Sequence, residues 1–196
     1  MASNQAPQPI VLVGGKSTRF GRDKLRAALA DGWLVDRPIA ALRAVFGPRV
    51  ALVGEAAPEV LARGDTTIVD RHPGIGPLGG IISALEAAGD VFVLPGDAPA
   101  IDAGAIRAIL ARAEESPEAW AVLADSGRLE PCVGLYRRAA LPALHAHRAR
   151  PEAPLGAAIP AQQLARVAVD VRRLANVNTP DDLSALGLDR EEGGER

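Results

Sequence analysis

Short apolar runs rich in Val and Ile alternate with longer helix-like stretches, and this alternation limits the possible folds more than any other feature. Runs of this length are typical of buried strands, which in a parallel sheet are apolar on both faces. We expect strands at residues 9–13, 49–53, 66–69, 91–94 and 119–124, and helices at 35–46, 58–63, 78–88 and 103–115. Successive βαβ units predict an α/β fold with three layers (α/β/α) and a Rossmann-like, mainly parallel sheet.

The last third of the sequence is less regular. A run at residues 131–136 follows a Ser-Gly turn and is consistent with an antiparallel strand. We further expect a helix at 141–150, a late strand at 167–171 and a final helix that starts around Asn178 to Asp182, where cap residues, a Pro and acids follow one another. The predicted organisation is a flexible N-terminus (1–8), one domain (9–188) and a disordered tail (189–196).

Composition narrows the class of protein. A chain of 196 residues that is 48% hydrophobic suits one domain, and a net charge of −2 predicts no general attraction to nucleic acid or to anionic membranes. Cys132 is the only cysteine, so an internal disulfide is excluded and a cysteine-based metal site is disfavoured. The first nine residues lack a signal-peptide pattern and no apolar run is long enough to span a bilayer. We therefore expect a cytoplasmic protein.

A glycine-rich basic loop follows the first expected strand. Residues 14–24 contain three glycines, four cations and two hydroxyl side chains. Glycines let backbone N–H groups approach an anion, and Lys and Arg supply charge, so the loop predicts a phosphate site. It is not a P-loop, because Ile10 stands where that pattern needs Gly, and Lys16 breaks the dinucleotide fingerprint. The alternative is a solvated basic turn.

Two carboxylates also follow expected strands. Asp97 comes after the run at 91–94 and could hold Mg²⁺, which prefers oxygen ligands and substrate phosphates, or could merely cap a turn before Pro99. Asp70 follows the third strand, ahead of a helix whose first turns contain Gly79 and Gly80. Glycines at that position allow a ligand to approach closely. His72, between them, is interpreted as a surface residue.

Residues 12–24 resemble the signature of the molybdenum cofactor guanylyltransferase family, which belongs to the nucleotidyltransferases of the nucleotide-diphospho-sugar transferase type. Three further segments resemble that family and occur in its order: 76–80 (Gly-Pro-Leu-Gly-Gly), 95–99 (Pro-Gly-Asp-Ala-Pro) and 176–183 (Asn-Val-Asn-Thr-Pro-Asp-Asp-Leu). The chain departs from the pattern at Val13, where the family normally has Ala, and at Gly54, where many members have an Asn that contacts the nucleotide.

The resemblance implies transfer of GMP from GTP to the terminal phosphate of molybdopterin, with release of pyrophosphate. The nucleotide-binding residues that it implies are Leu12, Val13, Gly14, Gly15, Lys16, Lys24, Gly54, Asp70, Gly79 and Asp97. It assigns catalysis to Arg19, Lys24 and Asp97, a magnesium ion to Asp97, and contacts with the pterin-side substrate to Asn176 and Asn178. The partners it implies are GTP, molybdopterin or the molybdenum cofactor, and proteins that deliver the cofactor or chaperone molybdoenzymes.

Two other functions remain open at this point. A relative of the same fold could transfer CMP, or another NMP to a different phosphorylated small molecule, and the departures at Val13 and Gly54 leave the base undecided. A non-catalytic nucleotide-binding adaptor could also keep the loop. The presence of both Asp97 and Lys24 favours an enzyme.

Overall fold

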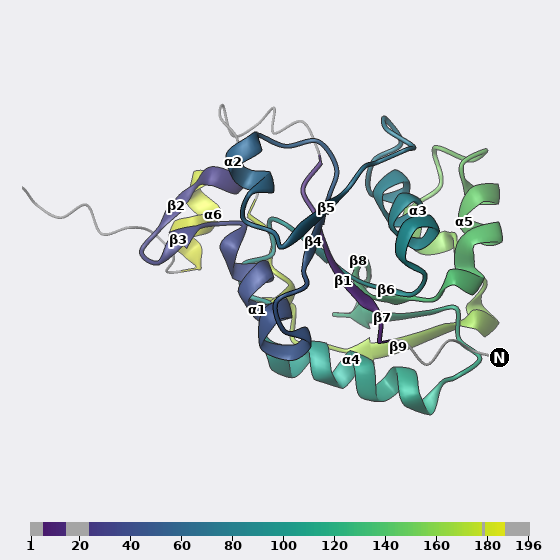
Figure 1. Cartoon of the computed structure of the whole chain (residues 1–196). Helices are drawn as coiled ribbons and strands as arrows, with labels where there is room; N and C mark the ends of the chain where they lie inside the picture. Colours follow the sequence, from purple (N-terminus) through teal and green to yellow (C-terminus); the bar gives the residue numbers. More distant parts are fainter. Residues whose placement is uncertain (1–5, 15–23, 178, 187–196) are drawn as a thin grey trace, which may run out of the picture.

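The computed structural model describes residues 6–14, 24–177 and 179–186. Its centre is a seven-stranded sheet with the strand order β5-β4-β1-β6-β8-β7-β9 (Figure 1). The strands of this sheet are β1 (Gln8–Leu12), β4 (Ala51–Val53), β5 (Thr66–Ile68), β6 (Val91–Pro95), β7 (Ala121–Asp125), β8 (Leu129–Tyr136) and β9 (Leu164–Ala168). A separate antiparallel hairpin joins β2 (Ala28–Leu29) to β3 (Gly32–Trp33).

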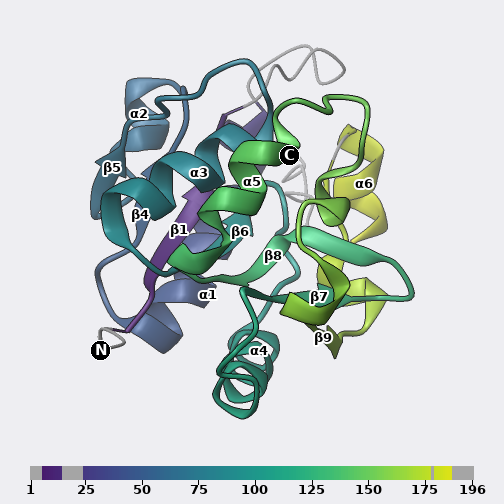
Figure 2. The same ribbon diagram turned by 90° about the vertical axis from the view of Figure 1, so that its right-hand side faces the viewer.

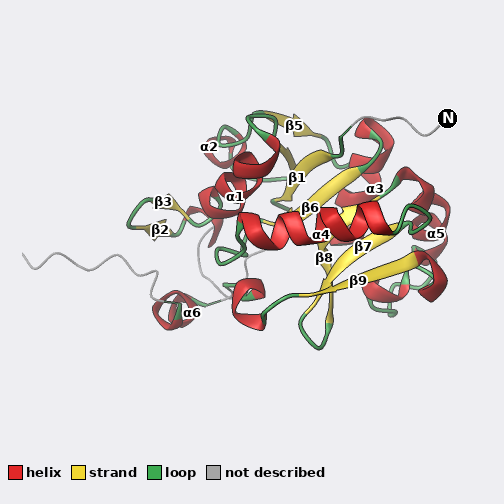
Figure 3. Cartoon of the chain, turned by 90° about the horizontal axis from the view of Figure 1, so that it is seen from below, coloured by secondary structure: helices red, strands yellow, loops and turns green. Residues whose placement is uncertain are grey.

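Helices cover both faces of the sheet, which confirms the three-layer α/β/α prediction. Helices α1 (Asp36–Phe46) and α4 (Ala103–Glu115) pack on one face, where α4 crosses the strands in Figure 3. Helices α3 (Pro77–Ala88) and α5 (Leu141–His147) lie side by side on the other face (Figure 2). Of two short helices, α2 (Pro58–Leu61) buries Val60 in the same core as α1 and α4, and α6 (Pro180–Ala185) packs through Leu183 near the hairpin. None of the helices in the described part of the chain is long and apolar enough to cross a membrane.

The predicted elements are present, and their ends differ where local chemistry overrides the pattern. Helix α5 ends at His147 rather than at residue 150, because Pro151 keeps the residue before it out of the helical region. The late strand spans Leu164–Ala168 instead of 167–171, since Val171 starts a 3₁₀ turn. Strand β8 is antiparallel to both of its neighbours, as expected. The predictions for residues 1–5 and 187–196 lie outside the described residues.

The topology brings the ends of the parallel strands to one edge of the sheet. Strand β1 pairs in parallel with β4 and β6, and β4 pairs in parallel with β5. The segments that follow these strands therefore leave the sheet at the same carboxyl edge, which is where ligands bind in open α/β sheets. Gly14, Gly54, Asp70 and Asp97 all lie in these segments.

Candidate nucleotide-binding site

Three segments that are far apart in the sequence meet at the carboxyl edge. The ammonium group of Lys24 forms an ion pair with Oδ2 of Asp97 and donates a 3.5 Å hydrogen bond to the carbonyl of Val177. The backbone N–H of Val177 in turn donates to the carbonyl of Asp97 at 2.9 Å. The side chains of Lys24 and Asp97 are only 21% and 18% exposed, so their charges interact in a partly dry environment.

Close backbone packing places Asp97 beside the loop that follows β1. The N–H of Gly96 donates to the carbonyl of Leu12 at 2.9 Å, which ties the end of β6 to the end of β1. A Cβ on Gly96 would lie 3.1 Å from that carbonyl oxygen and 3.0 Å from Cδ2 of Leu25. Glycine is thus the residue that lets the turn before Asp97 pass this close to β1 and Leu25.

Gly54 allows a similar approach on the other side of β1. Its φ is +115°, a conformation that side chains rarely adopt, and a Cβ there would lie 2.6 Å from the backbone nitrogen of Gly14. An Asn at this position would therefore not fit this backbone, and Gly54 can offer only main-chain contacts. Val13, the other departure, is 4% exposed and belongs to the core cluster that includes residues of α1 and α4.

Gly54→Ala is expected to lower both stability and nucleotide affinity, because the new Cβ would displace Gly14. Strained positive φ alone costs about 1–3 kcal/mol, which in a chain of this size corresponds to a fall in Tm of ~2–4 °C per kcal/mol. Gly89→Ala is the matched control, since Gly89 has φ +83° but no atom within 4 Å of the new Cβ. Thermal unfolding with and without GTP measures both effects. Equal losses in the two variants would show that contact with Gly14 is unimportant.

The start of α3 is held against the loop that precedes it. Oδ1 of Asp70 accepts hydrogen bonds from the hydroxyl of Ser83 at 2.9 Å and from the N–H of His72 at 2.8 Å. A Cβ on Gly79 would lie 2.2 Å from the carbonyl oxygen of His72, so only glycine fits where the helix meets the loop. Asp70 thus orders the loop at the carboxyl edge through one of its oxygens.

His72 is less exposed, and makes more side-chain contacts, than the surface residue expected from the sequence. Its side chain is 16% exposed and its Nε2 lies 3.2 Å from Glu86 on α3. Glu86 also lies 3.3 Å from Nε2 of His145 on α5. The contacts of Glu86 with His72 and His145 hold the loop, α3 and α5 together. In the described part of the chain, no three His, Cys, Asp or Glu side chains have the geometry of a metal site.

The donors around Asp97 suit a hard cation that takes oxygen ligands. Asp97 offers one carboxylate, and Mg²⁺ is commonly held by one or two carboxylates together with substrate phosphates. The thiol near Asp97 does not compete as a ligand. Burial, and then the charges of Asp97 and Glu130, raise the pKa of Cys132 from 9.0 to about 12, so it stays protonated and unable to bind a metal.

Cys132 is accordingly expected to resist alkylation in the native protein. Because its pKa is raised, the folded state keeps the thiol protonated at pH 8, whereas the unfolded chain would have an appreciable thiolate fraction. Iodoacetamide labelling followed by mass spectrometry should therefore be slow for the native protein and fast in denaturant. Equal rates in the two states would contradict the burial of this thiol.

The structure brings two pairs of the predicted site residues into contact. Lys24 contacts Asp97, and Gly14 contacts Gly54 at the same edge. Asn176 is exposed and immediately precedes Val177. The predictions for Gly15, Lys16, Arg19 and Asn178 fall outside the described residues. Sequence reasoning missed the backbone role of Val177 and the hydroxyl of Ser83, which no motif marks.

Comparison with known proteins points to one family. The profile of the MobA-like NTP transferase domain matches residues 9–167. A probable molybdenum cofactor guanylyltransferase from Chloroflexus aggregans is 32% identical, over 90% of this chain and 91% of the relative, and one from Opitutus terrae is 33% identical, over 88% and 90%. The crystal structure of molybdopterin-guanine dinucleotide biosynthesis protein A from Archaeoglobus fulgidus has a TM-score of 0.72 and 22% identity, over 91% and 95% of the two chains.

Proposed function

Because the chain belongs to the MobA-like NTP transferase family, we propose that it is a molybdenum cofactor guanylyltransferase, which joins GMP from GTP to molybdopterin. The observation that carries this proposal is the junction of Lys24, Asp97 and Val177 beside Gly14. A cation and a carboxylate at the carboxyl edge of a parallel sheet are the groups that a triphosphate and its metal ion require.

In the proposed reaction, an oxygen of the terminal phosphate of molybdopterin attacks the α-phosphorus of GTP. A new P–O bond forms to the α-phosphorus, the bond from it to the bridging oxygen of the β-phosphate breaks, and pyrophosphate leaves with that oxygen. The attacking phosphate is already ionised near neutral pH, so no side chain has to take a proton. Catalysis then depends on positioning and on charge stabilisation.

The residues of this chain divide these tasks. Lys24 would neutralise charge on the triphosphate and on the leaving pyrophosphate, and the backbone N–H of Gly14 would be a further donor to the phosphates. Asp97 would hold Mg²⁺, which when bound supplies positive charge to the phosphate oxygens. Lys24 and Asp97 form an ion pair with each other, so in the proposed complex contacts to phosphate and metal would replace or share this contact. We assign a contact with the acceptor to Asn176, which is exposed and immediately precedes Val177.

Purified protein offered all four NTPs together with molybdopterin tests the proposal. We expect magnesium-dependent pyrophosphate release with GTP preferred, and a GTP-specific rise in Tm, because a ligand that binds only the native state stabilises it by mass action. A preference for CTP would overturn the choice of base, which matters because Gly54 has no side-chain amide that could contact the base. Nucleotide binding without pyrophosphate release would indicate an adaptor instead.

A further inference from the structure

One stripe along α3 faces the loop that follows β5. Gly79, Ser83 and Glu86 lie on this stripe, because residues three and four positions apart share a face of a helix. Gly79 makes room for the backbone of His72, since a Cβ there would lie 2.2 Å from its carbonyl oxygen. Glu86 lies 3.2 Å from Nε2 of the same histidine. Ser83, between them on the stripe, lies opposite Asp70.

The hydroxyl of Ser83 makes two hydrogen bonds to this loop. It donates to Oδ1 of Asp70 at 2.9 Å and accepts from the backbone N–H of Arg71 at 2.9 Å. Ser83 is 1% exposed, so water does not compete for either bond. A hydroxyl is costly to bury unless its donor and acceptor are used, and here both are. The side chain of Ser83 therefore fixes the loop relative to α3.

The two carboxylate oxygens of Asp70 have different surroundings. Oδ1 accepts from the hydroxyl of Ser83 and from the backbone N–H of His72. Within the described part of the chain, Oδ2 has no hydrogen-bond partner, and it is not among the buried side-chain atoms that lack one there. Two donors on Oδ1 restrict the rotation of the carboxylate. Oδ2 is thus left as the accessible acceptor, in an orientation that the protein sets.

Asp70 lies in a segment that runs beside the proposed nucleotide site. The last residues of β1, β4 and β5 pair in one row, so the segments after these strands leave the sheet side by side. Gly14 and Gly54 follow the first two strands, and Asp70 follows the third. A Cβ on Gly80 would lie 2.9 Å from Cδ2 of Leu12, so the start of α3 closely covers the end of β1 (Figure 2). A nucleotide bound over the loop after β1 would therefore lie next to the loop of Asp70.

We propose that Ser83 is a positioning residue for the nucleotide: its hydroxyl holds Oδ1 of Asp70 so that Oδ2 accepts a hydrogen bond from the nucleotide. This inference rests on the proposed function, which supplies the nucleotide. An ionised carboxylate can only accept, so the group that it meets is a ribose hydroxyl or an N–H of the base. Neither group takes part in the transfer of the α-phosphorus. Ser83 should therefore affect affinity for the nucleotide and leave the chemical step alone.

Ser83→Ala is expected to raise the Kd for GTP about five- to tenfold while kcat changes less than about twofold. Alanine favours a helix, so the variant should fold. Calorimetric titration of the full-length protein with GTP measures Kd, and steady-state pyrophosphate release measures kcat. Ala84→Gly is the matched control, because Ala84 is buried at the next position of α3 and its side chain cannot hydrogen-bond. It should lower Tm and leave Kd unchanged. An unchanged Kd for Ser83→Ala, or an equal rise in both variants, would overturn the inference.

Asp70→Asn separates positioning from a merely structural role of Ser83. Asn keeps an oxygen for the donors from Ser83 and His72 but places an amide NH₂ group where Oδ2 stood, so the nucleotide loses its acceptor. In this background, Ser83→Ala should weaken GTP binding no further, because no acceptor remains to be positioned. A second loss as large as that in the wild-type background would contradict the proposal.

2′,3′-Dideoxy-GTP, which lacks both ribose hydroxyls, identifies the donor. If the rise in Kd caused by Ser83→Ala disappears with this analogue, Oδ2 of Asp70 meets the ribose, and if it persists, Oδ2 meets the base. Either result supports positioning through Asp70. Failure of the proposed function would show separately, as GTP binding by the wild type without pyrophosphate release.

Discussion

Asp97→Ala is expected to lower the rate of pyrophosphate release by about 10³-fold or more, because it removes the only acidic ligand assigned to the metal. The fold should survive. The Asp97 side chain is partly exposed, and the bond that ties this residue to Val177 uses its backbone carbonyl, which alanine keeps. Steady-state pyrophosphate release at saturating GTP measures the effect, and thermal unfolding checks the fold.

Asp102→Ala should show the opposite result, with lower stability and an unchanged rate of pyrophosphate release. Asp102 caps α4 by accepting from the N–H of Ala105 at 2.9 Å, and it lies five residues beyond Asp97 in the same segment. Loss of a cap costs about 1 kcal/mol of stability and leaves chemistry at a distant site unchanged. A rate for Asp97→Ala near that of the wild type, with Asp102→Ala also active, would refute the metal-binding role of Asp97.

Lys24→Met is expected to reduce turnover by about 10²–10³-fold and to raise KM for GTP, because charge developing on the leaving pyrophosphate loses its compensating cation. Methionine keeps much of the aliphatic stem, so packing next to Leu25 changes little. Arg26→Met serves as the control for charge alone. Arg26 is exposed two residues further on and stacks over Trp33 at 5.5 Å, away from Asp97. Its loss should leave the rate unchanged.

The double variant Lys24→Met with Asp97→Asn shows whether the two residues act as a unit. Groups in direct contact give effects on the rate that do not add, unlike groups more than about 7–10 Å apart. We therefore expect the double variant to be scarcely slower than the worse single variant. Fully additive losses would mean that the ion pair seen between the two side chains has no part in the active arrangement.

Much of the fold could be predicted from the sequence because its strands are buried on both faces. Continuous apolar runs such as residues 91–94 and 9–13 are unlike anything that a surface helix would contain. The turn after each strand then follows from parallel pairing, so Gly14, Gly54, Asp70 and Asp97 can be assigned to one edge from the sequence alone.

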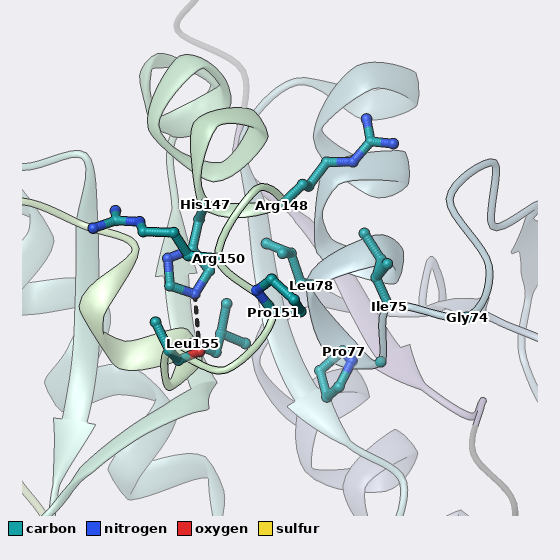
Figure 4. Close-up of a pocket in the computed structure, with 11 residues that line it drawn as sticks. Gly74, Ile75, Pro77, Leu78, His147, Arg148, Arg150, Pro151 and Leu155 are labelled. Atoms are coloured by element: carbon teal, nitrogen blue, oxygen red, sulfur yellow. Dashed lines mark hydrogen bonds between the residues drawn. The ribbon is translucent and has the colours of Figure 1, made fainter.

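The features that escaped prediction depend on contacts between distant backbone groups or on very short elements. The hairpin of β2 and β3 has two residues in each strand, too few for any periodicity. The part played by Val177 uses only its N–H and C=O, which every residue except proline carries. A cavity lies between the segment that leads into α3 (residues 74–78) and the segment after α5 (residues 147–155), and no pattern in these residues marks it (Figure 4).

The contacts of Val177 also bear on the order in which the sheet and the proposed site fold. Its carbonyl contacts Lys24 across 153 positions of sequence, and its side chain packs with Leu183 against Ala27, Leu29 and Leu34 near the hairpin. Contacts between residues so far apart form late in folding, because closing a long loop costs entropy before it gains stability. During synthesis, the sheet can therefore assemble while Lys24 and Asp97 still lack their contacts with Val177. A nascent chain completes the proposed site only after the segment around Val177 has left the ribosome.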